Sequence, residues 1–190
     1  MISLGMDLSL TATGIVKIKN GKIIDRRLIK SKPTGKKPID ELMRLLQIAD
    51  NSVFSEKVND PDIVAVEGLA FMARNTTALC QLAGLNYLIR ERLYTLDIPF
   101  IIVAPSSLKK FITGKGNSAK DVILMEIYKR YGETFTDDNE ADAFGLAKIG
   151  EAILKKTKLT IPQQEVVDMV KQQYDRANAK KRYSVRMPAL

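Results

Sequence analysis

The chain opens with Ile2-Ser3-Leu4-Gly5-Met6-Asp7-Leu8-Ser9-Leu10-Thr11-Ala12-Thr13-Gly14, the stretch that decides its fold. Its first residues alternate as in a strand and end on the carboxylate of Asp7, and a polar turn follows. A second strand is predicted over Ile15–Lys19, and the Asn20-Gly21 pair after it is a strong signal for a tight hairpin. Lys22–Ile29 supplies a third strand. The start of the chain is therefore predicted to be an antiparallel meander.

The rest of the chain alternates between helical and extended patterns. Apolar residues at helical spacing predict helices over residues 39–49, 76–96, 118–127 and 138–152. Short apolar runs at 61–67 and 99–104 predict buried central strands, and helices bridge the parallel connections between them. The order β-β-β-α-β-α-β-α-α predicts an α/β fold that resembles the ribonuclease H-like pattern, a mixed five-stranded sheet with helices on both faces.

The carboxyl-terminal part of the chain differs from the rest in charge. Residues 151–190 hold nine Lys or Arg and four Asp or Glu, and Pro162 marks a plausible boundary. We therefore expect one domain over residues 1–158 and a basic, helical extension over 159–190. The net charge of the whole chain, +8, favours a polyanionic partner.

The composition also limits the chemistry. Histidine is absent, so metal chemistry must use carboxylates, whose oxygens suit magnesium or manganese. The lone Cys80 excludes an intramolecular disulfide and suits a reducing cytosol, and we expect its thiol to be buried. Neither a signal peptide nor a membrane span is visible, so the protein is expected in the cytoplasm of a bacterial host cell, without a membrane partner.

Three carboxylates stand where the predicted fold would bring them together. Asp7 ends the first strand and Glu67 ends the fourth, so both acids would project at the same edge of the sheet. Asp142 lies on the last core helix. Taken alone, Asp7 could equally serve only to form the turn that follows the strand. When such acids cluster, their negative charges repel one another, which costs free energy. A pair of divalent metal ions removes that cost and can hydrolyse a phosphodiester.

Four segments, taken together, resemble the RuvC Holliday-junction resolvases. They are Gly5–Gly14, Val64–Asn75, Val103–Lys120 and Asp138–Ala147, and the resemblance spans residues 2 to about 155. The family pattern implies a homodimeric crossover junction endodeoxyribonuclease that uses Mg²⁺, with Mn²⁺ able to replace it, to nick four-way and other branched DNA. Helix 76–96, with Leu79, Leu82, Leu85, Tyr87 and Leu88, is the expected subunit interface.

The resemblance also implies roles for individual residues. Asp7, Glu67 and Asp142 match the metal ligands, and Lys120 matches a catalytic lysine near the scissile phosphate. Phe71, or alternatively Leu69, matches a residue that wedges between base pairs of the junction. Core packing is the plain alternative for Phe71, and a solvated loop is the alternative for the lysines. The residues expected on DNA are Leu69, Phe71, Arg74, Asn75, Lys109, Lys110 and Lys115, with Lys36 and Lys37 in a basic loop.

One position departs from the family pattern. The fourth metal residue of the family, an acid or a histidine, falls on Asn139, whose amide oxygen can ligate but carries no charge. Asp138, one residue earlier, is the other candidate. The departure concerns the affinity for the second metal ion and is consistent with a divergent, phage-type member.

Other functions stay open at this stage. A broad debranching nuclease would cut forks, flaps and three-way junctions, and a catalytically silent member would bind junctions without cutting them. The segment Asp7–Gly14 also resembles the phosphate-binding hairpin of actin-like ATPases and sugar kinases, but those proteins need two such domains and more length than 190 residues provide.

Overall fold

Five strands form one mixed sheet in the order β3-β2-β1-β4-β5. The computed structural model describes residues 1–54, 61–69, 76–155 and 158–179. The antiparallel meander predicted at the start of the chain is present, and β4 pairs in parallel with both β1 and β5. The strands are β1 (Ile2–Asp7), β2 (Ala12–Lys19), β3 (Lys22–Lys30), β4 (Ile63–Glu67) and β5 (Phe100–Val103).

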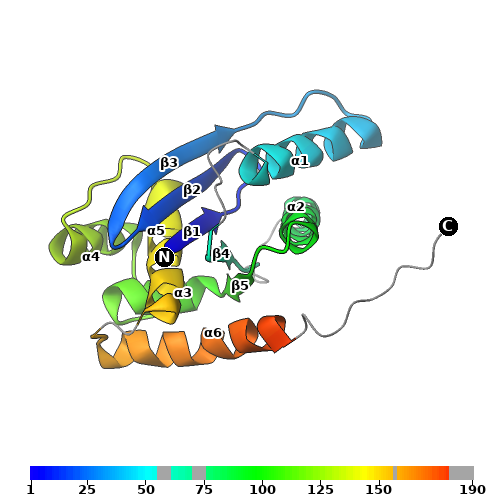
Figure 1. The fold of residues 1–190 in the computed structure, drawn as a ribbon. Helices are drawn as coiled ribbons and strands as arrows, with labels where there is room; N and C mark the ends of the chain where they lie inside the picture. The colour runs from blue at the N-terminus through cyan, green and yellow to red at the C-terminus, as the bar shows by residue number, and fades with distance from the viewer. Residues whose placement is uncertain (55–60, 70–75, 156–157, 180–190) are drawn as a thin grey trace.

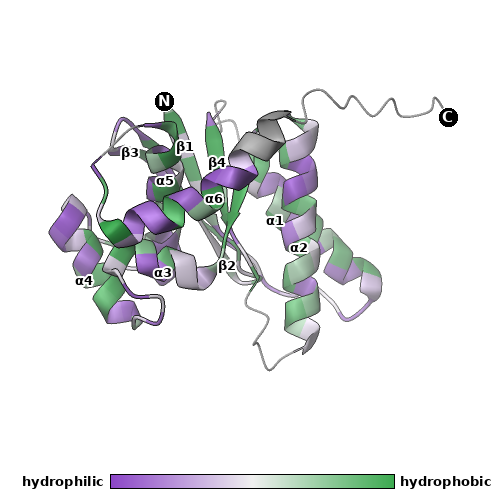
Figure 2. Cartoon of the chain, turned by 90° about the horizontal axis from the view of Figure 1, so that it is seen from below, coloured by the Kyte–Doolittle hydropathy of each residue, from purple (hydrophilic) through white to green (hydrophobic). Residues whose placement is uncertain are grey.

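Helices cover both faces of the sheet, as the order of elements predicts (Figure 1). Seen from below, the sheet stands between the pair α1 and α2 on one side and the helices α3 to α6 on the other (Figure 2). The helices are α1 (Pro38–Val53), α2 (Thr76–Thr95), α3 (Pro105–Thr113), α4 (Lys120–Tyr131), α5 (Asp138–Leu154) and α6 (Ile161–Ala179).

The two faces of β1 and β4 bury different side chains. Leu4 and Met6 of β1 pack with α1 and α2, together with Val64 and Val66 of β4. Ile63 and Ala65 belong to the other core, with residues of α3 to α6. Because side chains alternate along a strand, the residues that end these strands, Asp7 and Glu67, project on the side of α5.

Helix α5 lies unusually close to the middle of the sheet. A Cβ atom on Gly5 of β1 would collide with the backbone carbonyl of Ala143, and one on Gly14 of β2 would collide with the backbone of Asn139. Ser3 Oγ donates a hydrogen bond of 2.8 Å to the carbonyl oxygen of Ala147. The missing side chains of the two glycines therefore let the start of α5 reach the strand that carries Asp7.

Helix α6 shares the core of the sheet. Val166, Val167 and Val170 are buried with residues of α3 and β5. The Gln173 side chain also pairs with the outer strand β5, accepting from Ile102 N at 3.0 Å and donating to Ile102 O at 3.1 Å. The boundary expected at residue 158 stays a prediction, but removing α6 would uncover apolar side chains and the edge of β5.

Some local expectations were wrong. Helix α3 was not expected, although Leu108, Phe111 and Ile112 form its buried face. Helix α4 begins at Lys120, after the N-cap residue Ala119, instead of at residue 118. The thiol of Cys80 is exposed instead of buried. Among the described helices, none is both long and apolar enough to cross a membrane.

Candidate active site

The carboxyl groups of Asp7 and Glu67 meet at the carboxyl ends of β1 and β4. The side chains share a hydrogen bond, and only 6% of Asp7 is exposed. Burial, reinforced by the charge and hydrogen bond of Glu67, raises the pKa of Asp7 to about 9. Burial likewise raises the pKa of Glu67, and the nearby charge of Asp142 adds to that rise. At neutral pH this pair therefore holds a proton, and solvent hardly reaches the side chain of Asp7.

Asp142 adds a third carboxylate from α5, one turn into the helix. Burial and the negative charge of Asp7 raise its pKa to about 7. The helix begins at Asp138, after the N-cap residue Asp137, whose side chain accepts a hydrogen bond of 2.9 Å from Asn139 N. The sheet edge and the start of α5 thus bring together the three acids whose clustering the sequence predicts.

Lys120 lies at the rim of this acidic cluster. Its Nζ is 2.7 Å from Asp138 Oδ2, and its side chain is 72% exposed. The hydrogen bond that Lys120 donates to Asp138 is the main cause that raises the pKa of Lys120, with smaller contributions from the charges of Asp142 and Asp7. A small recess is lined by Lys120, Ile123, Leu124, Asp138, Ala141 and Asp142. The ion pair with Lys120 therefore occupies the carboxylate of Asp138.

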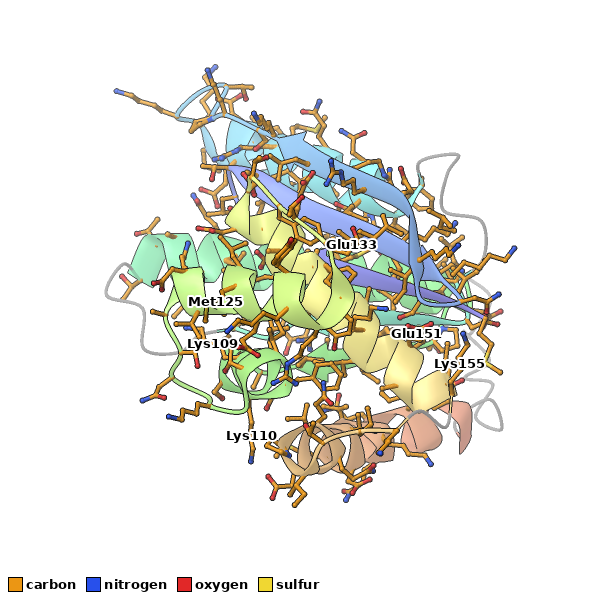
Figure 3. The ribbon with its side chains drawn as sticks, turned by 90° about the vertical axis from the view of Figure 1, so that its left-hand side faces the viewer. Lys109, Lys110, Met125, Glu133, Glu151 and Lys155 are labelled. Carbon is orange, nitrogen blue, oxygen red and sulfur yellow. The ribbon has the colours of Figure 1, made fainter. Side chains whose placement is uncertain are left out.

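The other expected lysines lie in different surroundings. Lys109 lies on α3, and its positive charge opposes the rise in pKa at both Glu67 and Asp142. Lys110, the next residue on α3, has its Nζ 2.5 Å from Glu165 Oε2 of α6. Figure 3 labels both lysines and shows Lys110 on the side of α3 that faces α6. Lys109 therefore lies within electrostatic reach of the acidic cluster, whereas Lys110 joins two helices.

The remaining positions expected on DNA fall into two groups. Lys115 is exposed between α3 and α4, and Lys36 and Lys37 are exposed before α1. Leu69 is half-buried two residues after Glu67. Phe71, Arg74 and Asn75 lie outside the described residues.

The donor atoms suit a hard divalent cation, although the side chains are not arranged around one. Within the described ranges, no three Asp, Glu or Cys side chains already form a metal-binding group. Asp7 and Glu67 bond each other instead. Oxygen donors are what Mg²⁺ prefers, and a cation among these acids would replace the shared proton and relieve the buried charge. The residues therefore fit a divalent metal by their chemistry.

One residue that contacts this site was not predicted from the sequence. Asn86 of α2 is buried, and its Nδ2 donates a hydrogen bond of 3.0 Å to the backbone carbonyl of Glu67. The signal was present, because Asn86 interrupts an apolar helix face that includes Leu82, Leu85 and Ile89. A lone amide in such a face needs a partner inside the molecule.

Comparison with known proteins identifies the family of this chain. Residues 3–150 match the family model described as crossover junction endodeoxyribonuclease RuvC. A protein of that name from Caldicellulosiruptor saccharolyticus is 30% identical over 151 residues, which cover 76% of this chain and 88% of the relative.

Solved structures are similar in fold. RuvC of T. thermophilus in complex with a Holliday junction substrate has a TM-score of 0.62 at 19% identity, covering 77% of this chain and 90% of that one. The yeast mitochondrial Holliday junction resolvase has a TM-score of 0.56 at 12% identity, covering 93% and 83%. The match of the family model to residues 3–150, together with the 30% identical relative, shows that the chain belongs to the RuvC family of crossover junction endodeoxyribonucleases.

Proposed function

We propose that this chain nicks Holliday junctions and related branched DNA by hydrolysis of a phosphodiester, using Mg²⁺. The observation that carries the proposal is the buried cluster of Asp7, Glu67 and Asp142 at the carboxyl end of the central strands. Family membership adds the substrate class, since the relatives are named crossover junction endodeoxyribonucleases. Nucleases of this family depend on divalent metal ions.

The three carboxylates would hold the metal ions, with Asn139 and Asp138 as neighbouring oxygen donors. When bound, two such ions supply a water of lowered pKa and stabilise the charge on the leaving oxygen of the phosphodiester. The burial of Asp7 keeps water from competing with its oxygens and strengthens every electrostatic interaction in the site.

The lysines at the rim would orient the DNA. Lys120 is exposed and stands beside the acids, so its ammonium can leave Asp138 and bind the scissile phosphate as the DNA enters. Lys109 approaches the same acids from α3 and can hold an adjacent phosphate. The exposed side chains of Lys36, Lys37 and Lys115 would add contacts with the DNA backbone that do not depend on the base sequence.

A homodimer follows from the symmetry of a four-way junction, because paired nicks need two sites. The outer face of α2 offers Tyr87 and Tyr94, which are 65% and 69% exposed, beside Arg90, whose guanidinium stacks on the Tyr87 ring. Leu85 is fully buried in its own core, so it cannot belong to the interface as expected. Light scattering at micromolar concentration should give twice the mass of the chain, and Tyr87→Asp with Tyr94→Asp should give the monomer mass.

Nicking of a labelled synthetic four-way junction tests the proposed function. The matching linear duplex and a three-way junction are run beside it, each with Mg²⁺, Mn²⁺ or a chelator. Paired nicks in the four-way junction, lost with the chelator, are the expected result. Equal cutting of the three-way junction would favour the broad debranching nuclease, and no preference for branched DNA over duplex would refute the proposal.

Asn139 sets the metal requirement in this proposal. Asn139→Asp adds a charged oxygen donor at the position where the family carries an acid or a histidine. We expect the Mg²⁺ concentration at half-maximal nicking to fall by about tenfold, the size of effect typical of residues that support a metal site. A titration of the nicking rate with Mg²⁺ measures it, with Asn139→Ala as control. An unchanged midpoint in Asn139→Asp would exclude Asn139 from the metal site.

A further inference from the structure

The buried amide of Asn86 is the feature that the proposed function does not use. Asn86 is 1% exposed, and its neighbours on the buried face of α2, Leu85, Ile89 and Leu93, are wholly apolar and fully buried. A polar group in such a face lowers stability unless its hydrogen bonds are satisfied. Its amide oxygen Oδ1 is buried and has no hydrogen-bond partner among the described residues. The amide is therefore poorly explained by stability alone.

The contact that Asn86 does make lies directly behind the acidic cluster. Its Nδ2 donates to the carbonyl oxygen of Glu67 at 3.0 Å. The paired residues of β1 and β4 end at Met6 and Val66, so the carbonyl of Glu67 is the first one beyond that ladder. The side chain of Asn86 thus supplies a donor at the point where the strand partner ends.

The Glu67 carboxylate lies on the face of β4 that is turned away from Asn86. Val64 and Val66 of β4 pack toward α1 and α2, so the alternation of the strand directs the Glu67 side chain toward α5. Asn86, from α2, therefore holds the backbone of Glu67 from the side opposite to its carboxyl group. The next residue, Gly68, donates its amide N–H to Val103 O at 2.8 Å, which fixes the other side of that peptide.

We infer that Asn86 is a positioning residue, which fixes the peptide after Glu67 and through it the direction of the Glu67 carboxylate. The inference rests on the proposed role of Glu67 in the active site. Asn86 also links α2, whose outer face carries the proposed subunit interface, to the catalytic cluster. Small errors in the position of a reacting group lower the rate of catalysis more than they lower binding.

The variant Asn86→Leu tests the role, because leucine has nearly the same shape and lacks the donor. We expect the single-turnover nicking rate at saturating Mg²⁺ to fall by about tenfold or more, with the Kd for the junction within about threefold of wild type. The Mg²⁺ concentration at half-maximal rate should rise at least about threefold. Asn86→Ala, which also lacks the donor, is a second variant in case Asn86→Leu does not fold.

Leu85→Ala is the matched control, because it loosens the same buried face of α2 one residue away. If Leu85→Ala loses rate and Mg²⁺ affinity as much as Asn86→Leu, the effect is one of packing and the inference fails. A folded Asn86→Leu or Asn86→Ala variant with the wild-type rate would also overturn it. Glu67→Gln, assayed in parallel, separates failure of the proposed active site from failure of the role of Asn86. A fully active Glu67→Gln variant would refute the proposed site itself. An inactive Glu67→Gln variant, together with an Asn86→Leu variant of wild-type activity, would refute only the role of Asn86.

Discussion

Asp7→Asn should lower the nicking rate by about 1,000-fold or more and, in the absence of metal, raise the melting temperature of the protein. The rate falls because the neutral asparagine amide replaces the most buried carboxylate of the cluster, and this carboxylate would hold the metal. The stability rises because the same charge is unfavourable without a cation. Activity assays on a four-way junction and thermal melts in chelator measure the two effects.

The pH dependence of that stabilisation follows from the pKa of Asp7. The ordinary value is 3.8, and burial with the neighbouring Glu67 raises it to about 9 in the folded protein. Folding therefore favours the protonated carboxyl, and wild type loses stability as the pH rises from about 4 toward 9. Asparagine is neutral throughout, so the gain should be small at pH 5 and should grow toward pH 8.

A gain of about 2 kcal/mol, which corresponds to several degrees in melting temperature for a chain of this size, is a reasonable scale at pH 8. Asp168→Asn, at an exposed site on α6, is the control and should change neither the rate nor the melting temperature in this way. A melting temperature of Asp7→Asn that falls at every pH would show that Asp7 stabilises the fold, contrary to the buried-charge argument.

Lys120→Ala should lower the single-turnover nicking rate by about 100-fold with little change in junction affinity. The ammonium of Lys120 stands beside the acids and is held there by Asp138, so its loss removes a charge from the reacting phosphate. One phosphate contact among many contributes little to binding, which is why the Kd should stay within about threefold.

Lys110→Ala is the matched control for Lys120→Ala. Both changes remove one positive charge, but Lys110 is bound to Glu165 of α6. Its loss should leave the rate within about threefold and lower the melting temperature slightly. Equal losses of rate in the two variants would mean that total charge, rather than the position of Lys120, sets the rate.

Much of this arrangement could be predicted from the sequence. The Asn20-Gly21 turn and the alternation of Ile2–Asp7 predict the meander, and the acids that end β1 and β4 follow from the strand pattern. Those signals are local and strong, because turn residues and alternating side chains have few other uses. The position of Asp142 relative to Asp7 follows once the last core helix is placed on the sheet.

Other features could not be predicted, for physical reasons. The hydrogen bond from Asn86 to Glu67 joins a helix and a strand end through a tertiary contact, which no local pattern encodes. The pairing of Lys120 with Asp138 depends on how α4 and α5 approach each other. Helix α3 was missed because its lysines and the glycines after it suggested a loop, although Leu108 and Phe111 have helical spacing.

The close contact between β1 and α5 has a consequence for synthesis of the protein. Asp142 follows Asp7 by 135 positions in the sequence, so the two stay apart until α5 has left the ribosome. Contacts so distant in sequence form late in folding. The nascent chain is thus expected to be inert toward DNA until α5 has emerged, because the three carboxylates cannot assemble before then.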